Sequence, residues 1–222
     1  MGILENIRKL NAEIPGHVTI IAVSKRKPVE DIMKAYEAGH RIFGENRVQE
    51  LIEKQPLLPE DINWHMIGHL QTNKVKYIAG FVDMIHSVDS LKLALAIDRE
   101  AFQTGRVIPV LLQVHIADEE SKFGFSEDEL NSLLDSPELS VLKNIRIDGL
   151  MGMATYTEDL EKIRLEFRCL SEVFSRVKND YFAGSDHFRQ ISMGMSGDYE
   201  MAIEEGSTMI RVGTVIFGAR TY

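Results

Sequence analysis

Hydrophobic positions along the chain follow two alternating periods. Short, nearly continuous apolar runs, such as Val18-Thr-Ile-Ile-Ala-Val-Ser24, are typical of strands that are buried on both faces. Longer segments between them place apolar residues three or four positions apart, as amphipathic helices do. The runs predict about eight strands, at residues 18–24, 41–44, 62–67, 83–87, 107–115, 145–150, 187–192 and 209–212. The intervening segments predict helices at residues 28–38, 46–54, 71–79, 89–104, 126–135, 158–177 and 197–205.

Local signals support several of these helices. Pro28 suits a first helical turn, and Gly39 offers a C-terminal stop for the same helix. Ser126 and Glu129 have the spacing of a capping box. The segment 158–177 carries a long apolar stripe that predicts a core-facing surface, formed by Leu160, Ile163, Phe167, Leu170, Phe174 and Val177.

Strand–helix units repeated along the chain predict parallel strands joined by right-handed crossovers. About eight such strands fit an α/β fold of the closed (β/α)8 TIM barrel type, which takes roughly 250 residues. A doubly wound open sheet is the alternative. Because no low-complexity tract or Pro/Ser-rich run interrupts the pattern, residues 1–222 are interpreted as a single domain.

Composition and charge narrow the classes of function. Hydrophobic residues make up 44% of the chain and charged residues 27%, as in ordinary soluble domains. The formal net charge of −9 argues against broad binding to nucleic acid or to anionic membranes. Residues 1–10 have an amphipathic helical pattern rather than that of a leader, and no apolar stretch approaches the roughly 20 residues that cross a bilayer. A cytoplasmic monomer is the expectation.

The first candidate for chemistry is the lysine that ends the first apolar run. In TIM barrels the working face is built by the C-terminal ends of the strands and the loops after them, and this rule brings Lys25, Asn46 and Ser192 to one face. The run before Lys25 predicts that its amine emerges from a low-dielectric wall, where the neutral, nucleophilic form is favoured. The alternative is a lysine that extends into solvent at a strand end.

Loops rich in Gly, Ser and Thr follow the last two predicted strands on the same face. Such loops bind phosphate through backbone N–H groups and hydroxyls, which makes Ser196 and Gly213-Thr214 candidate anion ligands. Asp198 and Glu200, in the first turn of the following helix, oppose this interpretation because carboxylates repel anions. Helix capping alone is the alternative role for this segment.

Arg211 lies two residues before Gly213, so strand alternation places both on one face. A guanidinium that met a pyridine nitrogen would keep that nitrogen unprotonated and leave the ring a poor electron sink. Pairing with a surface carboxylate is the alternative for this arginine.

Other polar clusters have structural roles as alternatives to a functional one. His65 and Asn73 either support the site or only orient the turn between them. Asp83, His86 and Ser87 are not taken as a catalytic triad, since no nucleophile-elbow pattern surrounds them. The sequence predicts no metal site and no catalytic residue.

A lysine amine and phosphate-binding loops on one face match a single small molecule. Pyridoxal 5′-phosphate carries an aldehyde, which forms a Schiff base with a lysine such as Lys25, and also a phosphate ester. The cofactor predicted from these residues is therefore pyridoxal 5′-phosphate.

Longer motifs point in the same direction. They are Ala22-Val-Ser-Lys25, Phe43-Gly-Glu-Asn46 with Val48-Gln-Glu50, His65-Met-Ile-Gly-His-Leu-Gln-Thr-Asn-Lys74, Ser192-Met-Gly-Met-Ser196, Arg211-Val-Gly-Thr214 and Phe217-Gly-Ala-Arg220. Through them the chain resembles the pyridoxal-phosphate homeostasis protein family, often called YggS-like or PROSC-like, from about Val18 to Arg220. One departure is His115, where the family is expected to favour Asn.

The resemblance implies a barrel similar to the N-terminal domain of alanine racemase. It implies that Ser196, Gly213 and Thr214 hold the phosphate, that Arg211 faces the pyridine nitrogen and that Asn46 lies beside the cofactor. The full set of cofactor-binding candidates is Lys25, Asn46, Ser192, Ser196, Arg211, Gly213 and Thr214.

The resemblance also implies a role in vitamin B6 and amino-acid balance without a demonstrated catalytic activity. Only eight residues follow Thr214, so no second domain is expected to bring a catalytic tyrosine over the cofactor, and neither Tyr156 nor Tyr222 has a supporting context for that role. The favoured hypothesis is a carrier that holds the cofactor as a lysine aldimine, with cofactor-dependent apo-enzymes as candidate recipients. The alternatives are a one-domain racemase or amino-acid lyase that uses the cofactor, and a Schiff-base aldolase that needs none.

Overall fold

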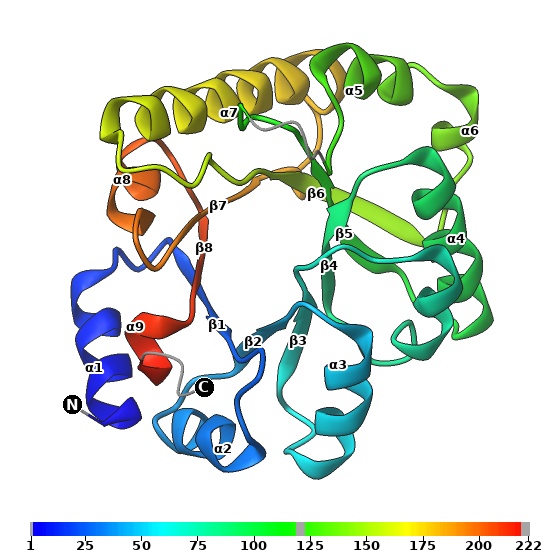
Figure 1. The fold of residues 1–222 in the computed structure, drawn as a ribbon. Coiled ribbons are helices and arrows are strands. Elements are labelled where there is room, and N and C mark those ends of the chain that lie inside the picture. The colour runs from blue at the N-terminus through cyan, green and yellow to red at the C-terminus, as the bar shows by residue number, and fades with distance from the viewer. Residues whose placement is uncertain (1, 119–122, 219–222) are drawn as a thin grey trace.

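The computed structural model describes residues 2–118 and 123–218. Its strands form a closed barrel in which each strand pairs in parallel with the next and β8 pairs with β1 (Figure 1). The predicted TIM barrel is therefore confirmed, and the open doubly wound sheet is excluded. The strands are β1 (Thr19–Val23), β2 (Ile42–Glu45), β3 (Asn63–Met66), β4 (Met84–Val88), β5 (Ile108–Gln113), β6 (Ile145–Met151), β7 (Gln190–Met195) and β8 (Met209–Val212).

Helices surround the barrel on its outer side (Figure 1). None of the helices in the described part of the chain is long and apolar enough to cross a membrane. The α-helices are α1 (Ile3–Glu13), α2 (Val29–Glu37), α3 (Val48–Lys54), α4 (Leu91–Gln103), α5 (Glu127–Leu134), α6 (Pro137–Ser140), α7 (Leu160–Tyr181), α8 (Tyr199–Glu204) and α9 (Thr214–Phe217). Two 3₁₀ segments are η1 (Gln55–Leu57) and η2 (Thr72–Tyr77).

Most predicted helices are present, with ends that differ by a few residues. The capping box at the start of α5 is confirmed, because the Ser126 side chain accepts from the Glu129 N–H and Glu129 accepts from the Ser126 N–H. The predicted helix at 71–79 is instead the 3₁₀ segment η2. Its turns close three residues back, as in the bond from the Lys74 N–H to the Gln71 carbonyl.

The prediction for β7 is shifted by three residues. The strand runs Gln190–Met195 rather than 187–192, so Ser192 lies inside it. The Gly/Ser-rich run was interpreted as a loop, but Gly194 has a φ of +92°, and a Cβ there would lie 2.6 Å from the Ala202 side chain. Glycine at this position therefore lets α8 pack closely on the strand.

Apolar residues form one core between strands and helices and a second inside the barrel. The inner cluster contains Ile21, Met84, Leu111, Met151 and Met209, with Ile42 packed against it. The predicted stripe on α7 faces the outer core except at its first residue, Leu160, which is 61% exposed and lines a surface pocket.

Candidate functional site

Four consecutive strands around the barrel carry all seven predicted site residues. β7, β8, β1 and β2 are neighbours in the closed sheet, so the loops after them meet at one sector of the barrel mouth. Ser192 lies within β7 and Arg211 within β8, whereas the other five lie just beyond a strand end. Those five are Lys25, Asn46, Ser196, Gly213 and Thr214.

Lys25 lies in a turn directly after β1. The strand before it is buried at Ile21, Ala22 and Val23, and Lys25 itself is half-buried. The Lys27 N–H donates to the Ser24 carbonyl (3.0 Å) and closes the turn around Lys25. The Lys25 backbone is therefore held in a short turn at the end of a buried strand.

Sequence reasoning missed a buried charged residue behind this turn. Lys54, the last residue of α3, donates to the Glu45 carboxylate (2.7 Å) and to the Glu50 carboxylate (2.7 Å). Burial raises the pKa of Glu45 to about 7, although hydrogen bonds from Lys54 and Ser24 lower it in part. The ion pair between Glu50 and Lys54 could have been predicted from the sequence, because residues four apart on a helix are neighbours.

Asn46 follows β2 and has a close neighbour. A Cβ on Gly68 would lie 2.4 Å from the Asn46 carbonyl oxygen, so only glycine allows the loop after β3 to pack there. The amide oxygen of Asn46 is buried and has no hydrogen-bond partner among the described residues. This orphaned acceptor at the barrel mouth fits a site that is completed by a ligand.

Arg211 does not pair with a surface carboxylate. It is buried inside the barrel, where it donates to the Ser192 hydroxyl oxygen (2.6 Å) and to the Gly152 carbonyl (2.9 Å). Burial lowers the pKa of Arg211 to about 10, opposed in part by the charge of Asp198, so the guanidinium stays protonated at neutral pH. In the part of the chain that the structure describes, Arg211 forms no ion pair within 4.0 Å.

A chain of hydrogen bonds continues from Arg211 across the barrel interior. Nδ1 of His86 lies 2.9 Å from the Ser192 hydroxyl, and Nε2 of His86 lies 2.9 Å from Nδ1 of His65. Because β4 and β7 are not neighbours in the sheet, the contact between His86 and Ser192 must cross the interior. His65 is thus linked to Arg211 through His86 and Ser192, whereas Asn73 lies in η2 on the outside, beside α4.

The direction of the first bond in this chain follows from chemistry. Arg211 can only donate, so the Ser192 hydroxyl oxygen accepts from it. The direction of the bonds from Ser192 to His86 and from His86 to His65 is set by which nitrogen of each imidazole carries the proton. Burial lowers the pKa of His65 to about 4 and holds that of His86 well below its usual range, so both rings are neutral.

The rejected triad is also absent from the geometry. Asp83 accepts from the Trp64 N–H (2.7 Å), and the Ser87 hydroxyl donates to the Gly68 carbonyl (2.6 Å). His86 contacts Ser192 instead of either residue. The three side chains therefore serve separate parts of the barrel.

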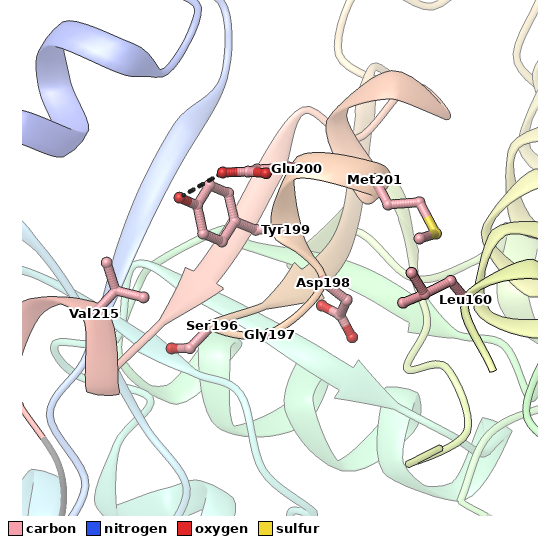
Figure 2. Close-up of a pocket in the computed structure, with 8 residues that line it drawn as sticks. All are labelled: Leu160, Ser196, Gly197, Asp198, Tyr199, Glu200, Met201 and Val215. Atoms are coloured by element: carbon pink, nitrogen blue, oxygen red, sulfur yellow. Dashed lines mark hydrogen bonds between the residues drawn. The ribbon is translucent and has the colours of Figure 1, made fainter. Parts of the chain in front are cut away.

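The loops after β7 and β8 meet directly. The N–H of Gly213 donates to the Ser196 hydroxyl oxygen (3.0 Å), and Thr214 begins α9 at that point. The first N–H groups of α9 have no acceptor within that helix. A pocket of about 380 Å³ opens beside these loops (Figure 2), lined by Leu160, Ser196, Gly197, Asp198, Tyr199, Glu200, Met201 and Val215.

Asp198 and Glu200, the two acidic residues that line this pocket, each accept a hydrogen bond from a neighbouring residue. A carboxylate oxygen of Asp198 accepts from the Met195 N–H, and Glu200 accepts from the Tyr199 hydroxyl (3.3 Å; Figure 2). In Figure 2 the side chains of Ser196 and Asp198 point in different directions. Burial raises the pKa of Asp198, opposed in part by the hydrogen bond from the Met195 N–H and by the charge of Arg211.

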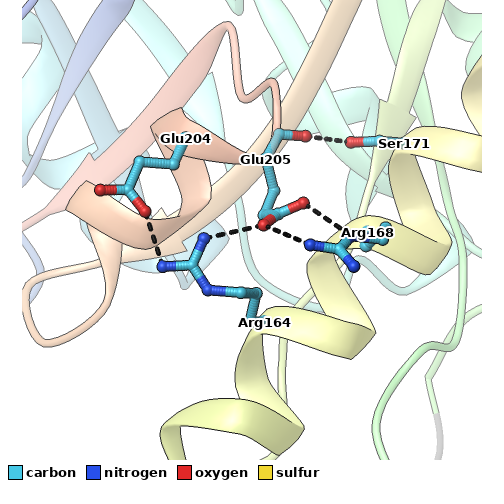
Figure 3. Close-up of polar contacts among 5 residues, drawn as sticks. All are labelled: Arg164, Arg168, Ser171, Glu204 and Glu205. Carbon is cyan, nitrogen blue, oxygen red and sulfur yellow. Dashed lines mark hydrogen bonds and ion pairs between the residues drawn. The ribbon is translucent and has the colours of Figure 1, made fainter.

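Surface ion pairs hold α8, the helix that follows the Ser196 loop. Glu205 accepts from Arg164 (2.8 Å) and from Arg168 (3.1 Å), and Glu204 accepts from Arg164 (2.6 Å; Figure 3). The Ser171 hydroxyl donates to the Glu205 carbonyl. These contacts attach the C-terminal end of α8 to α7.

Three other residues singled out in the sequence do not contribute to the geometry described above. Tyr222 and Arg220 lie outside the described residues. Tyr156 is described and is 97% exposed, and it lines a separate hollow of about 200 Å³ beside Gln113 and His115.

Known proteins resemble this chain over nearly its whole length. A family model for the alanine racemase N-terminal domain matches residues 2–221. The pyridoxal phosphate homeostasis protein of Aquifex aeolicus is 42% identical over 91% of this chain and 87% of its own length. Among solved structures, PipY of Synechococcus elongatus with PLP bound is 39% identical, with a TM-score of 0.88 over 97% of this chain and 100% of PipY.

The alanine racemase of Clostridium difficile has a TM-score of 0.78 but only 17% identity, and this chain covers 56% of it. That similarity concerns the fold alone. The chain belongs to the pyridoxal phosphate homeostasis protein family, whose barrel has the fold of the alanine racemase N-terminal domain.

Proposed function

We propose that this protein binds pyridoxal 5′-phosphate at the barrel mouth through a Schiff base on Lys25 and serves vitamin B6 and amino-acid homeostasis without robust catalysis of its own. PipY, at 39% identity, is a structure with PLP bound, which supports the choice of ligand. Cofactor-dependent apo-enzymes are the proposed recipients, and the proposed state is a monomer.

The pairing of β8 with β1 is the observation that carries this proposal. Ala22 lies opposite Val212, and a Cβ on Gly213 would lie 3.2 Å from the Val23 carbonyl oxygen. Lys25 therefore follows, by two residues, the point where β1 contacts Gly213. This proximity of the Lys25 turn to Gly213 supports binding of one small phosphorylated aldehyde by the amine and the loop together.

The remaining residues fit the same ligand. Asn46 offers a buried amide oxygen without a hydrogen-bond partner, and Arg211 offers a guanidinium without a carboxylate contact, both within residues 2–118 and 123–218. Ser196, Gly213 and Thr214 would hold the phosphate ester with a hydroxyl and backbone N–H groups. Binding of the phosphate would compete with the present contact between Gly213 and Ser196.

Arg211 supports a holding role over a catalytic one. Bound pyridoxal phosphate supplies an aldehyde carbon for amines and a ring that can accept electrons. A guanidinium has donors but no acceptor, so a ring nitrogen that faces Arg211 stays unprotonated and the ring accepts electrons poorly. Ser192 and the Gly152 carbonyl fix this guanidinium in place.

Reduction and peptide mapping test the proposal. Protein mixed with pyridoxal phosphate should absorb in the near-visible, lose that absorbance with borohydride, and yield one tryptic peptide modified on Lys25. Lys25→Ala should abolish the adduct. Lys27→Ala is the matched control, because Lys27 donates to the Phe217 carbonyl (3.1 Å) and should leave the adduct unchanged.

Each competing function has its own outcome. An adduct on another lysine, or none, contradicts the proposal. A colourless protein that cleaves sugar phosphates would instead be the cofactor-free aldolase. Steady turnover of any amino acid, followed by chiral product analysis and lost in Lys25→Ala, would identify a racemase or lyase.

A further inference from the structure

The turn that contains Lys25 has an unusual backbone. Arg26 has a φ of +60° and is the one non-glycine residue with positive φ in the described part of the chain. That conformation is unfavourable for a residue with a long side chain and persists only where surrounding contacts enforce it. The contacts that enforce it come from β2 and α3.

Lys54 supplies the first of these contacts. Its side chain is only 9% exposed, and its ammonium donates to the Ser24 carbonyl (2.9 Å), Glu45 (2.7 Å) and Glu50 (2.7 Å). An ammonium has three protons, so each has an acceptor. A buried cation with three good acceptors is stable in its place and is costly to remove.

The two carboxylates reach both neighbours of Lys25. Glu50 accepts from the Arg26 N–H (2.6 Å), directly after the lysine. Glu45 accepts from the Ser24 hydroxyl (2.7 Å), directly before it. The backbone on each side of Lys25 is thus attached to one buried cluster that lies between the barrel and α3.

We propose that Lys54, Glu45 and Glu50 form a positioning cluster that fixes the turn of Lys25 and neutralises the carboxylates beside it, so that the amine adds readily to an aldehyde. This inference rests on the proposed function. In the reaction the neutral amine bonds to the aldehyde carbon, and both of its N–H protons leave with the carbonyl oxygen as water. Orientation speeds the addition, and neutralised carboxylates do not hold the amine as ammonium.

The elements packed against this turn carry several charged or titratable groups. They are Arg26 and Lys27 of the turn, Glu45 of β2, Arg47 after it, Glu50 and Lys54 of α3, His65 of β3 and Arg211 of β8. Removal of the Lys54 charge leaves the Glu50 carboxylate behind Lys25 without its cation. The amine should then stay protonated to higher pH.

Stopped-flow absorbance tests the cluster. Apo-protein is mixed with pyridoxal phosphate, and the rate of Schiff-base formation is measured across pH. We expect Lys54→Met to slow formation by about tenfold or more and to move the midpoint of the pH–rate profile upward. Glu50→Gln should slow it by about threefold through the weakened hold on Arg26, while the lost negative charge moves the midpoint downward. Lys54→Arg should restore most of the rate.

Two control variants distinguish an effect on the position of Lys25 from a general loss of stability. Lys34→Met removes an exposed ion pair with Asp31 on α2, and Leu133→Ala opens a cavity in α5 far from the mouth. Both should react within about twofold of wild type with an unchanged midpoint. If Lys54→Met fails to fold, Glu50→Gln decides the question.

Wild-type rate and midpoint in both Lys54→Met and Glu50→Gln would overturn the positioning cluster while leaving the proposed function intact. Wild-type protein that forms no adduct at Lys25 would overturn the proposed function, and this inference with it. The two failures are therefore distinguishable.

Discussion

The two sides of the barrel mouth rest on charge clusters of opposite character. Behind β1 and β2, Glu45 and Lys54 are buried together, and burial raises the pKa of Glu45 to about 7. Beside β7 and β8, Glu205 pairs with Arg168 and Arg164 at the surface, and these arginines lower its pKa. Similar partners at similar distances thus shift two carboxylates in opposite directions.

The difference shows that the surroundings of an ion pair decide its effect more than its distance does. Water screens the surface network, so it contributes little free energy and mainly holds α8 against α7. The buried cluster has lost its hydration, so each partner depends on the other. A single substitution should therefore change the free energy of unfolding strongly in the buried cluster behind β1 and β2, and weakly in the network beside β7 and β8.

Lys54→Met should have the largest effect. It removes a buried hydrogen-bond donor from Glu45 and from the Ser24 carbonyl and the cation that pairs with Glu50, which should lower the free energy of unfolding by about 3–5 kcal/mol. Urea denaturation followed by circular dichroism measures the loss. Lys34→Met, in an exposed pair, should leave the midpoint almost unchanged. Equal losses in the two variants would contradict the comparison.

Glu45→Gln should change how stability depends on pH. The folded protein keeps a proton on Glu45 up to about pH 7, whereas the unfolded chain releases it near the usual pKa of 4.5. This contribution is fully present below pH 4.5 and is lost as pH rises through 7. Glutamine does not titrate, so the unfolding free energy of the variant minus that of wild type should rise by roughly 2–3 kcal/mol from about pH 5 to about pH 8.

Denaturation curves at several pH values check this prediction. The difference between variant and wild type removes the contribution of every other titrating group. A difference that stays flat over this range would mean that Lys54 keeps Glu45 ionised in the folded protein.

Ser192→Ala should have an intermediate effect on the other side of the mouth. It removes an acceptor from Arg211 and the hydrogen-bond partner of Nδ1 of His86, and both groups are buried. The expected loss is about 1–2 kcal/mol, because Arg211 keeps the Gly152 carbonyl. Chemical denaturation measures it, and an unchanged midpoint would show that water replaces the hydroxyl.

Arg168→Gln should have the smallest effect. Glu205 keeps its contact with Arg164, and the pair lies at the surface. We expect the melting temperature to fall by no more than about 2 °C. Differential scanning fluorimetry with and without added salt is the measurement, and a drop as large as that of Lys54→Met would remove the distinction between the two sides.

The barrel itself could be predicted from the sequence because its strands are apolar runs and its helices carry regular stripes. The position of Lys25 at the end of β1 followed from the same pattern. The shift of β7 could not be predicted from the sequence. The segment Ser192-Met-Gly-Met-Ser196 has loop composition and becomes a strand only by pairing with β6 and β8. Tertiary contacts overrode local preference there.

The hydrogen-bond partners of the buried polar side chains were harder to predict than the places of these residues in the fold. Arg211 was expected either to meet a ligand or to pair with a surface carboxylate, but no spacing in the sequence indicates a bond to Ser192 or a link on to His86 and His65. Lys54 was not singled out because a lysine that ends a short helix normally faces water. Only the closure of the sheet brings these residues together.

The hydrogen bonds from Arg211 to His65 connect four strands through side chains. Arg211 of β8 donates to Ser192 of β7, which contacts His86 of β4, which contacts His65 of β3. Because all four side chains are buried, loss of one leaves its neighbour without that partner. These four positions should therefore change together rather than singly in the course of evolution.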